Sequence, residues 1–363
     1  MIKKIKILFY AHDLCFGGSW RKVERMLDKI NIDLFDPFVF YWDESPNNER
    51  LPYLQKKLDN NHLAPFQRSI EKYGPEKAYT PTYSNFIEKA KQYDFDICYF
   101  PRSGHKEWVY IDRFAKLQIE NNIFAGVDNS PYLDKSICLS HYIAKKRGKC
   151  DAVVYNPIPD HDFTIINWRS KYNIPQDAIV AGRIGTPADE SFHPIALQVF
   201  QKLTKEFKNI YFIIVAPGNK WTRFVHDNKI NNVILVDFTV DDTVISEFYQ
   251  TIDFFMHARC LGETFGSVIA ESLMAGKPVV SHKVNKIGYC SNNGHGETIG
   301  KCGLLANNEQ EYYDFCKEMI INTSKRIQLG KMARDSALDR FESTKVTRQL
   351  EQLFIKWLGE IKK

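Results

Sequence analysis

Residues 254–281 read FFMHARCLGETFGSVIAESLMAGKPVVS, and this stretch is the most informative in the chain. The apolar run at 254–258 is typical of a buried strand, and a glycine-containing turn follows it. Apolar residues then recur at helical spacing over 267–275, until Gly276 and Pro278 mark the end of the helix. A second apolar run begins at residue 278. Strand, helix and strand at this spacing predict a parallel α/β unit.

The same alternation extends along the whole chain. Residues 5–11 form an apolar run, and a turn containing Gly17 and Gly18 separates it from an amphipathic stretch that ends near Ile30. Further strands are predicted at 38–41, 97–100, 123–127, 137–139, 152–155, 179–184, 211–215 and 233–236, with helices at 194–207 and 243–251. We therefore expect an α/β fold with two Rossmann-like domains whose parallel sheets face each other across a cleft.

Loop-forming residues between 157 and 175 separate the two halves. We place the first domain at 1–160 and the second at 161–343. The last residues, 344–363, contain an amphipathic helix that needs an apolar surface to lie on.

The composition and charge exclude several classes of protein. The chain has 363 residues, of which 44% are hydrophobic and 26% charged, as in an ordinary globular protein. No apolar run approaches the roughly 20 residues that span a bilayer, and residues 5–11 are predicted to be a buried strand rather than part of a signal peptide. The net charge of +5 suits a phosphorylated ligand or an anionic membrane but is too weak and dispersed for nucleic acid.

The eight cysteines lack metal-ligand spacing, so we expect reduced thiols, no metal site and a cytoplasmic location. The aromatic share, 13%, is unusually high.

The turn before the helix at 267–275 carries candidate chemistry. A helix N-terminus presents unpaired N–H groups and a positive dipole end, which favour a phosphate, and Gly266 lets a ligand approach the backbone closely. Glu271 lies on the same side of the helix as Ser267, where it can accept hydrogen bonds from ribose hydroxyls, while Glu263 can face a sugar. These positions suit a nucleotide sugar. Alternatively, Thr264 or Ser267 is only an N-cap and both glutamates are solvated charges, and spacing alone leaves this open.

The whole arrangement resembles the signature of the family 4 retaining glycosyltransferases, which have the GT-B fold. Seven residues separate Glu263 from Glu271, and Ala-Gly-Lys-Pro-Val-Val follows. Other segments that resemble this family are Gly17-Gly18, 94–97, Ser140, 154–158, Gly182-Arg183-Ile184, Asp241-Asp242 and Phe248-Tyr249. The resemblance implies metal-independent transfer of a sugar, with retention of anomeric configuration, from a UDP- or GDP-sugar donor and without a further cofactor. It also implies that the helix at 344–363 crosses back onto the N-terminal domain.

The resemblance assigns roles residue by residue. Arg183 is expected to bind the donor diphosphate and Glu263 to position the transferred sugar. The expected donor site comprises Gly17, Gly18, Arg183, Thr264, Phe265, Gly266, Ser267, Val268 and Glu271. The N-terminal domain is expected to hold a glycan, lipid-linked or protein-linked acceptor, with Phe16, Trp20, His105 and Trp108 as candidate contacts. Peripheral contact with an anionic membrane is a further option, for which the candidate cations are Arg21, Lys22, Lys145, Lys146, Arg147 and Lys149.

Four departures mark a divergent relative of this family. Residues 185–191 lack the family's phosphate-binding lysine, which leaves Arg183 and the helix N-terminus, with Lys220 as an additional candidate. Asp128 lies in the region where a histidine is usual, the loop at 286–297 replaces the usual donor loop, and Pro157 replaces a glycine. Two other functions therefore stay open, a nucleotide-sugar epimerase of the same fold and a nucleotide-binding pseudoenzyme that acts as a partner subunit.

A metal-binding alternative starts from Asp94-Phe95-Asp96. This Asp-x-Asp pattern is found in the other main glycosyltransferase fold, where it holds a metal ion against the diphosphate. Here it leads into a buried strand far in sequence from Glu263, which disfavours a metal site.

Overall fold

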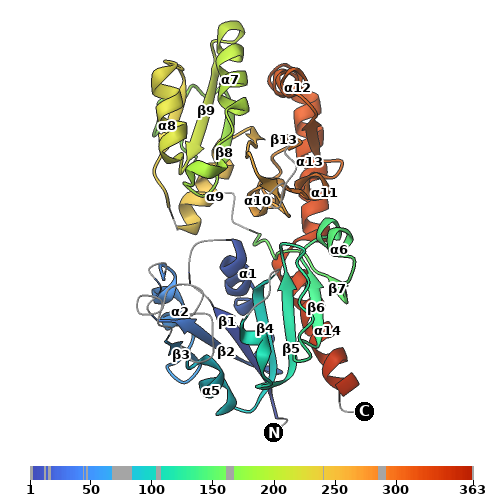
Figure 1. Ribbon diagram of the computed structural model, residues 1–363. Coiled ribbons are helices and arrows are strands. Elements are labelled where there is room, and N and C mark those ends of the chain that lie inside the picture. The colour runs from blue at the N-terminus through green and yellow to red at the C-terminus, as the bar shows by residue number, and fades with distance from the viewer. Residues whose placement is uncertain are drawn as a thin grey trace. The chain divides into compact units, whose positions relative to one another are not determined.

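The computed structural model describes residues 3–11, 14, 18–43, 45, 48–67, 84–103, 108–160, 167–239, 241–284 and 292–361. The chain forms two compact units. The first unit comprises Met1–Pro157 together with Ser343–Lys363, and the second comprises Ile158–Glu342. Figure 1 shows the elements of both units, coloured along the chain.

The first unit is built on a seven-stranded parallel sheet with the order β3-β2-β1-β4-β5-β6-β7. Its strands are β1 (Ile5–Ala11), β2 (Phe35–Trp42), β3 (Leu63–Phe66), β4 (Phe95–Ser103), β5 (Ala115–Asn122), β6 (Lys135–Cys138) and β7 (Ala152–Val153). Its helices are α1 (Gly18–Leu27), α2 (Leu51–Lys57), α5 (Phe86–Lys91), the 3-10 turn η2 (Trp108–Ile111), α6 (His141–Arg147) and α14 (Ser343–Ile361).

Strand β1 shows why this sheet is buried on both sides. Ile7 and Phe9 point to a core shared with α1 and α14, whereas Leu8 and Tyr10 point to a second core on the opposite face. The second core is rich in phenylalanine and tyrosine, with Phe86 of α5 packed edge-on against Tyr10 at a ring-centroid distance of 4.9 Å. Much of the aromatic excess therefore fills the interior.

The last helix packs as expected. Along α14, residues Val346, Leu350, Phe354 and Trp357 are buried in the first core. Phe354 contacts Tyr99 of β4 edge-on at 5.8 Å. The C-terminal helix thus returns to the N-terminal sheet, as Figure 1 shows in red. Within the described ranges, no helix has the length and apolar composition needed to cross a membrane.

The second unit contains a six-stranded parallel sheet with the order β10-β9-β8-β11-β13-β15. Its strands are β8 (Ile179–Ile184), β9 (Ile210–Val215), β10 (Val233–Val236), β11 (Phe254–Met256), β13 (Val279–His282) and β15 (Gly303–Ala306), with a separate pair β12 (Gly262–Glu263) and β14 (Asn292–Asn293). Its helices are η3 (Asp189–Ser191), α7 (Ile195–Glu206), α8 (Gly218–Asp227), α9 (Asp242–Thr251), α10 (Ser267–Met274), α11 (His295–Ile299), α12 (Glu309–Ile321) and α13 (Thr323–Arg340). The α/β fold with two parallel sheets is confirmed.

One predicted strand is wrong. A strand was expected at 123–127, but β5 occupies Ala115–Asn122. Its sequence, AKLQIENN, looks polar, yet Gln118, Glu120 and Asn121 are fully buried. Two of them have partners on helices, since Lys22 of α1 donates to Asn121 Oδ1 at 2.8 Å and Arg147 of α6 pairs with Glu120. Gln118 accepts a hydrogen bond from the backbone N–H of Phe114, just before the strand, at 2.9 Å. Buried polar groups that are satisfied in this way conceal a strand from hydropathy.

Candidate functional site

The carboxyl ends of β8 and β11 define the switch point of the second sheet. From β8 the chain builds outward to β9 and β10, whereas from β11 it builds in the opposite direction to β13 and β15. In open parallel sheets the loops diverge at such a point and leave room for a ligand. Arg183 lies at the end of β8, and His257, Arg259 and Glu263 follow β11. The site can therefore be built from these side chains outward.

Arg183 is stacked and buried. Its guanidinium carbon lies 4.0 Å from the centroid of the Trp221 ring, on α8. The residue is 5% exposed, and its Nη1 atom has no hydrogen-bond partner among the described residues. Burial first, and the positive charge of Arg259 second, lower the pKa of Arg183 to about 10. A stacked guanidinium keeps its N–H edge in one plane, which suits bidentate contact with phosphate oxygens.

Glu263 lies beside Arg259 and His257. Arg259 Nη1 donates to Glu263 Oε1 at 2.8 Å, and His257 Nε2 lies 3.7 Å from the same oxygen. Burial alone would raise the pKa of the Glu263 carboxyl, but Arg259 and His257 outweigh it and lower the pKa to about 2. His257 is held in turn by Ser281, whose Oγ lies 2.8 Å from Nδ1. Glu263 is therefore a fixed carboxylate at neutral pH.

The turn between Glu263 and α10 has a left-handed backbone at its last residue. Gly266 has a φ of +86°, and its carbonyl accepts from the N–H groups of Ile269 and Ala270 at 3.0 and 3.1 Å. A side chain at this position would be strained. Phe265 is buried against Phe341, and its carbonyl oxygen accepts from Thr298 Oγ1 at 2.5 Å, so neither its ring nor its carbonyl faces a ligand. Thr264, Phe265, Gly266, Ser267 and Val268 are thus placed at one helix N-terminus, as the sequence predicts.

Glu271 lies one turn into α10 and is 8% exposed. Tyr249 of α9 donates its hydroxyl hydrogen bond to Glu271 Oε2 at 3.2 Å and is also 3.0 Å from the carbonyl oxygen of Val268. This contact fixes the carboxylate against α9. Glu271 therefore lies on the same helix whose N-terminus, with its positive dipole end, favours an anion.

The structure corrects part of the acceptor prediction. Trp20 is 2% exposed and belongs to the first core, and its Nε1 donates to Glu24 at 3.0 Å. It therefore offers no ring face to an acceptor. Gly18 begins α1 and is exposed, and Trp108 begins η2, where only its backbone is described. The predictions for Phe16, Gly17 and His105 lie outside the described residues.

Three of the six candidate membrane-facing cations are also corrected, whereas Lys145, Lys146 and Lys149 are exposed. Arg21, Lys22 and Arg147 are all at most 8% exposed. Arg21 pairs with Glu24, Lys22 donates to Asn121 Oδ1 at 2.8 Å, and Arg147 pairs with Glu120. These three charges are held inside the first unit and do not face a membrane.

The Asp-x-Asp segment lies at the start of β4, at the opposite edge of the sheet from the strands' carboxyl ends. Both carboxylate oxygens of Asp96 have partners, because Lys6 N–H donates to Oδ2 at 2.9 Å and Lys116 Nζ lies 2.8 Å from Oδ1. Asp96 therefore supports the edge of the first sheet. Among the described residues, no group of three or more His, Cys, Asp or Glu side chains is arranged to hold a metal ion.

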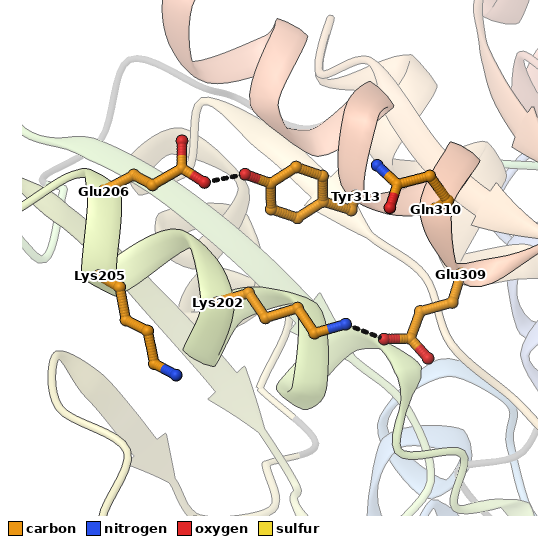
Figure 2. Close-up of a pocket in the computed structure, with 6 residues that line it drawn as sticks. All are labelled: Lys202, Lys205, Glu206, Glu309, Gln310 and Tyr313. Atoms are coloured by element: carbon orange, nitrogen blue, oxygen red, sulfur yellow. Dashed lines mark hydrogen bonds and ion pairs between the residues drawn. The ribbon is translucent and has the colours of Figure 1, made fainter.

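A surface groove of about 520 Å³ lies elsewhere in the second unit, between α7 and α12. It is lined by Lys202, Lys205, Glu206, Glu309, Gln310 and Tyr313, which Figure 2 shows. Lys202 pairs with Glu309 at 2.5 Å, and Tyr313 donates to Glu206. Most of its charged groups neutralise one another, and none of the predicted site residues lines it. We do not assign the donor to this groove.

Arg259 and Trp221 belong to the site but were not predicted from the sequence. Arg259 lies only four residues before Glu263, and an arginine that close to a predicted site carboxylate was the available signal. Nothing in the sequence around Trp221 indicated a site residue, because only the fold brings the Trp221 ring of α8 against Arg183 at the end of β8. Lys220, the candidate cation, is exposed on α8, where its backbone N–H donates to Asp189 at 2.8 Å.

The second unit is similar in sequence to known glycosyltransferases. Residues 175–322 match the family model of glycosyl transferases group 1, somewhat less than half of the chain and all within the second unit. An O-antigen biosynthesis glycosyltransferase, WclY of Escherichia coli, is 31% identical over 140 residues. That alignment covers 36% of this chain and only 37% of the relative.

Solved structures match over nearly the whole chain. A glycosyltransferase from Rickettsia africae superposes with a TM-score of 0.75 at 16% identity, covering 99% of both chains. Anabaena HepE, solved with UDP and glucose, gives 0.70 at 16% identity, covering 97% of this chain and 100% of HepE. The fold is therefore that of the GT-B glycosyltransferases, and the second unit is similar in sequence to glycosyl transferases of group 1.

Proposed function

We propose that this chain is a retaining glycosyltransferase that moves a sugar from a nucleoside diphosphate sugar to a glycan or glycoconjugate acceptor. The observation that carries the proposal is Arg183, a stacked and buried guanidinium with an unsatisfied Nη1 at the switch point of a group 1 glycosyl transferase-like unit. Such a group needs an anionic acceptor. The diphosphate of a donor supplies one.

Each side chain then has a role in the transfer. Arg183 and the N-terminus of α10 stabilise the negative charge that develops on the leaving diphosphate, an electrostatic contribution that strengthens in a site shielded from water. Glu271 accepts hydrogen bonds from the ribose hydroxyls. Glu263 accepts hydrogen bonds from the transferred sugar and positions it. Because arginine charge takes the place of a metal ion at the diphosphate, the proposed reaction needs no divalent cation.

Retention does not require Glu263 to attack the sugar. With a pKa of about 2, this carboxylate is a weak base at neutral pH, so it is poorly suited to accept a proton from the acceptor hydroxyl. Its Oε1 atom is also engaged by Arg259. We therefore assign proton acceptance to the leaving phosphate on the same face of the sugar, which retains the anomeric configuration.

The relatives guide the choice of substrates. HepE was solved with UDP-glucose, which makes UDP-sugars the first donors to test, with GDP-sugars second. WclY acts in O-antigen biosynthesis, which favours a glycan or lipid-linked glycan acceptor here. We place that acceptor on the first unit and the protein in the cytoplasm, where nucleotide sugars are available.

Incubation with UDP- and GDP-sugars tests the proposal. A transferase releases nucleoside diphosphate, slowly by donor hydrolysis without an acceptor and faster with one. An epimerase would instead change the sugar without releasing stoichiometric nucleotide, and a pseudoenzyme would bind nucleotide without turnover. Released UDP or GDP is measured with a coupled assay, with and without chelator. Activity that chelator removes and Mn²⁺ restores would overturn the metal-free mechanism.

A further inference from the structure

The switch point of the second sheet holds two arginines and one carboxylate. Arg183 Nη1 and Arg259 Nε are both buried, and neither has a hydrogen-bond partner among the described residues. Glu263 engages Arg259 only through Nη1, at 2.8 Å. Glu263 is the main negative charge acting on Arg259, with a smaller contribution from the exposed Glu190, and both guanidinium groups keep a buried N–H donor without an acceptor among the described residues.

Unsatisfied N–H donors on these two guanidinium groups are unfavourable. Like charges repel strongly where water is excluded, and a buried donor without an acceptor loses its hydration. Burial first, and the positive charge of Arg259 second, lower the pKa of Arg183, whereas Glu263 raises the pKa of Arg259. A ligand with several negatively charged oxygens would satisfy both arginines at once.

We propose that Arg259 is the second cation that binds the donor diphosphate, shared between that group and Glu263, and that it replaces the lysine absent from residues 185–191. This inference rests on the proposed function. It selects Arg259 over Lys220, because Arg259 contacts Glu263 and follows β11 at the switch point, whereas Lys220 is exposed on α8. It also makes the loop after β11, rather than the loop after β8, the source of the second positive charge.

The test measures how much the second phosphate adds to binding. Calorimetry gives the affinities for UDP and UMP, and for GDP and GMP, with the nucleosides as a baseline. In Arg259→Ala the affinity for the diphosphate falls about tenfold or more, as expected for loss of charge-assisted hydrogen bonds, while the nucleoside affinity is unchanged. Arg259→Lys recovers part of the loss. The exposed Arg223 of α8 provides the matched control, because Arg223→Ala should leave the ratio of diphosphate to monophosphate affinity at the wild-type value.

A double variant separates direct binding from an indirect effect. Arg259→Ala leaves Glu263 without its arginine, so the carboxylate alone could repel the diphosphate. Combining Arg259→Ala with Glu263→Gln removes that repulsion. If Arg259 binds the phosphates, the preference for the diphosphate over the monophosphate stays low in the double variant. Recovery of the wild-type preference would overturn the proposal, because Arg259 would then act only by neutralising Glu263.

Three other results would also overturn the proposal. One is an unchanged diphosphate preference in Arg259→Ala with UDP bound normally, which would leave the glycosyltransferase assignment intact. Another is a loss of diphosphate affinity in Lys220→Ala but not in Arg259→Ala, which would assign the second cation to Lys220. A wild-type chain that binds no nucleotide would contradict both this inference and the proposed function. Melting temperatures confirm that each variant is folded.

Discussion

Replacing Arg183 with methionine is expected to stabilise the unliganded protein and to remove diphosphate binding. The side chain is 5% exposed, and Nη1 has no partner among the described residues. Leaving a buried donor unsatisfied costs about 1–3 kcal/mol, and more when the group is charged. The pKa, lowered to about 10 mainly by burial, reflects the same cost. Because the guanidinium is charged below that pH, the penalty is present in full at neutral pH.

Methionine keeps most of the packing that arginine provides. The contact of Arg183 with the Trp221 ring, at 4.0 Å, contributes about 0.5–2 kcal/mol as a cation–π interaction. A sulfur–aromatic contact returns about 0.3–1.5 kcal/mol, so these two effects largely cancel. Removal of the unsatisfied charge then dominates, with a net gain of about 1 kcal/mol. In a domain of this size such a gain raises Tm by about 2–4 °C.

Thermal unfolding with and without UDP or GDP measures both effects. The wild type gains Tm on addition of the diphosphate it binds, whereas Arg183→Met starts higher and gains nothing. Arg223→Met on the exposed face of α8 is the matched control and changes neither quantity. A melting temperature several degrees below the wild type would refute the stability argument. A diphosphate-induced rise equal to that of the wild type would refute the binding role.

Three further predictions concern the loop after β11 and α10. Glu271→Ala is expected to lose the preference for UDP over its 2′- and 3′-deoxy forms, and calorimetry that still shows the wild-type preference would contradict a ribose role. Gly266→Ala places a side chain at a φ of +86° and 3.0 Å from Ile269 Cδ1, so unfolding should become easier by about 1–2 kcal/mol and diphosphate binding weaker. Glu263 has a folded pKa of about 2, below its unfolded value, so the stability it contributes is present above about pH 4.3 and is lost as the pH falls toward 2. Urea unfolding of Glu263→Gln should therefore show a smaller loss over that range, and equal losses would count against the Arg259–Glu263 pair.

The sequence predicts the second unit well because its strands are continuous apolar runs. Strand β8 has the predicted ends, 179–184, and β10 has the predicted ends, 233–236. Both are nearly or wholly apolar in sequence, with Arg183 placed only at the carboxyl end of β8. Strand β5 was not predicted because Glu120 and Asn121 are buried polar residues whose partners, Arg147 and Lys22, are far away in sequence. Hydropathy identifies a buried strand only where the buried side chains are apolar.

The site was predictable in part for a similar reason. The turn and helix from Glu263 to Glu271 are contiguous, so local spacing places them together. Arg259 and Trp221 become site residues only when the sheet brings the ends of β8 and β11 next to each other. Trp20 shows the opposite error, because it was predicted to contact the acceptor but is buried in the first core, where Nε1 donates to Glu24. Tertiary contacts, rather than residue type, decide these cases.

A crystal structure of the chain with UDP-glucose shows directly whether the two arginines bind the donor. We expect the diphosphate at the carboxyl ends of β8 and β11, with its oxygens within hydrogen-bonding distance of Arg183 and Arg259 and beside the N-terminus of α10. The ribose should lie against Glu271. A nucleotide bound away from both arginines, for example in the groove between α7 and α12 (Figure 2), would contradict this expectation.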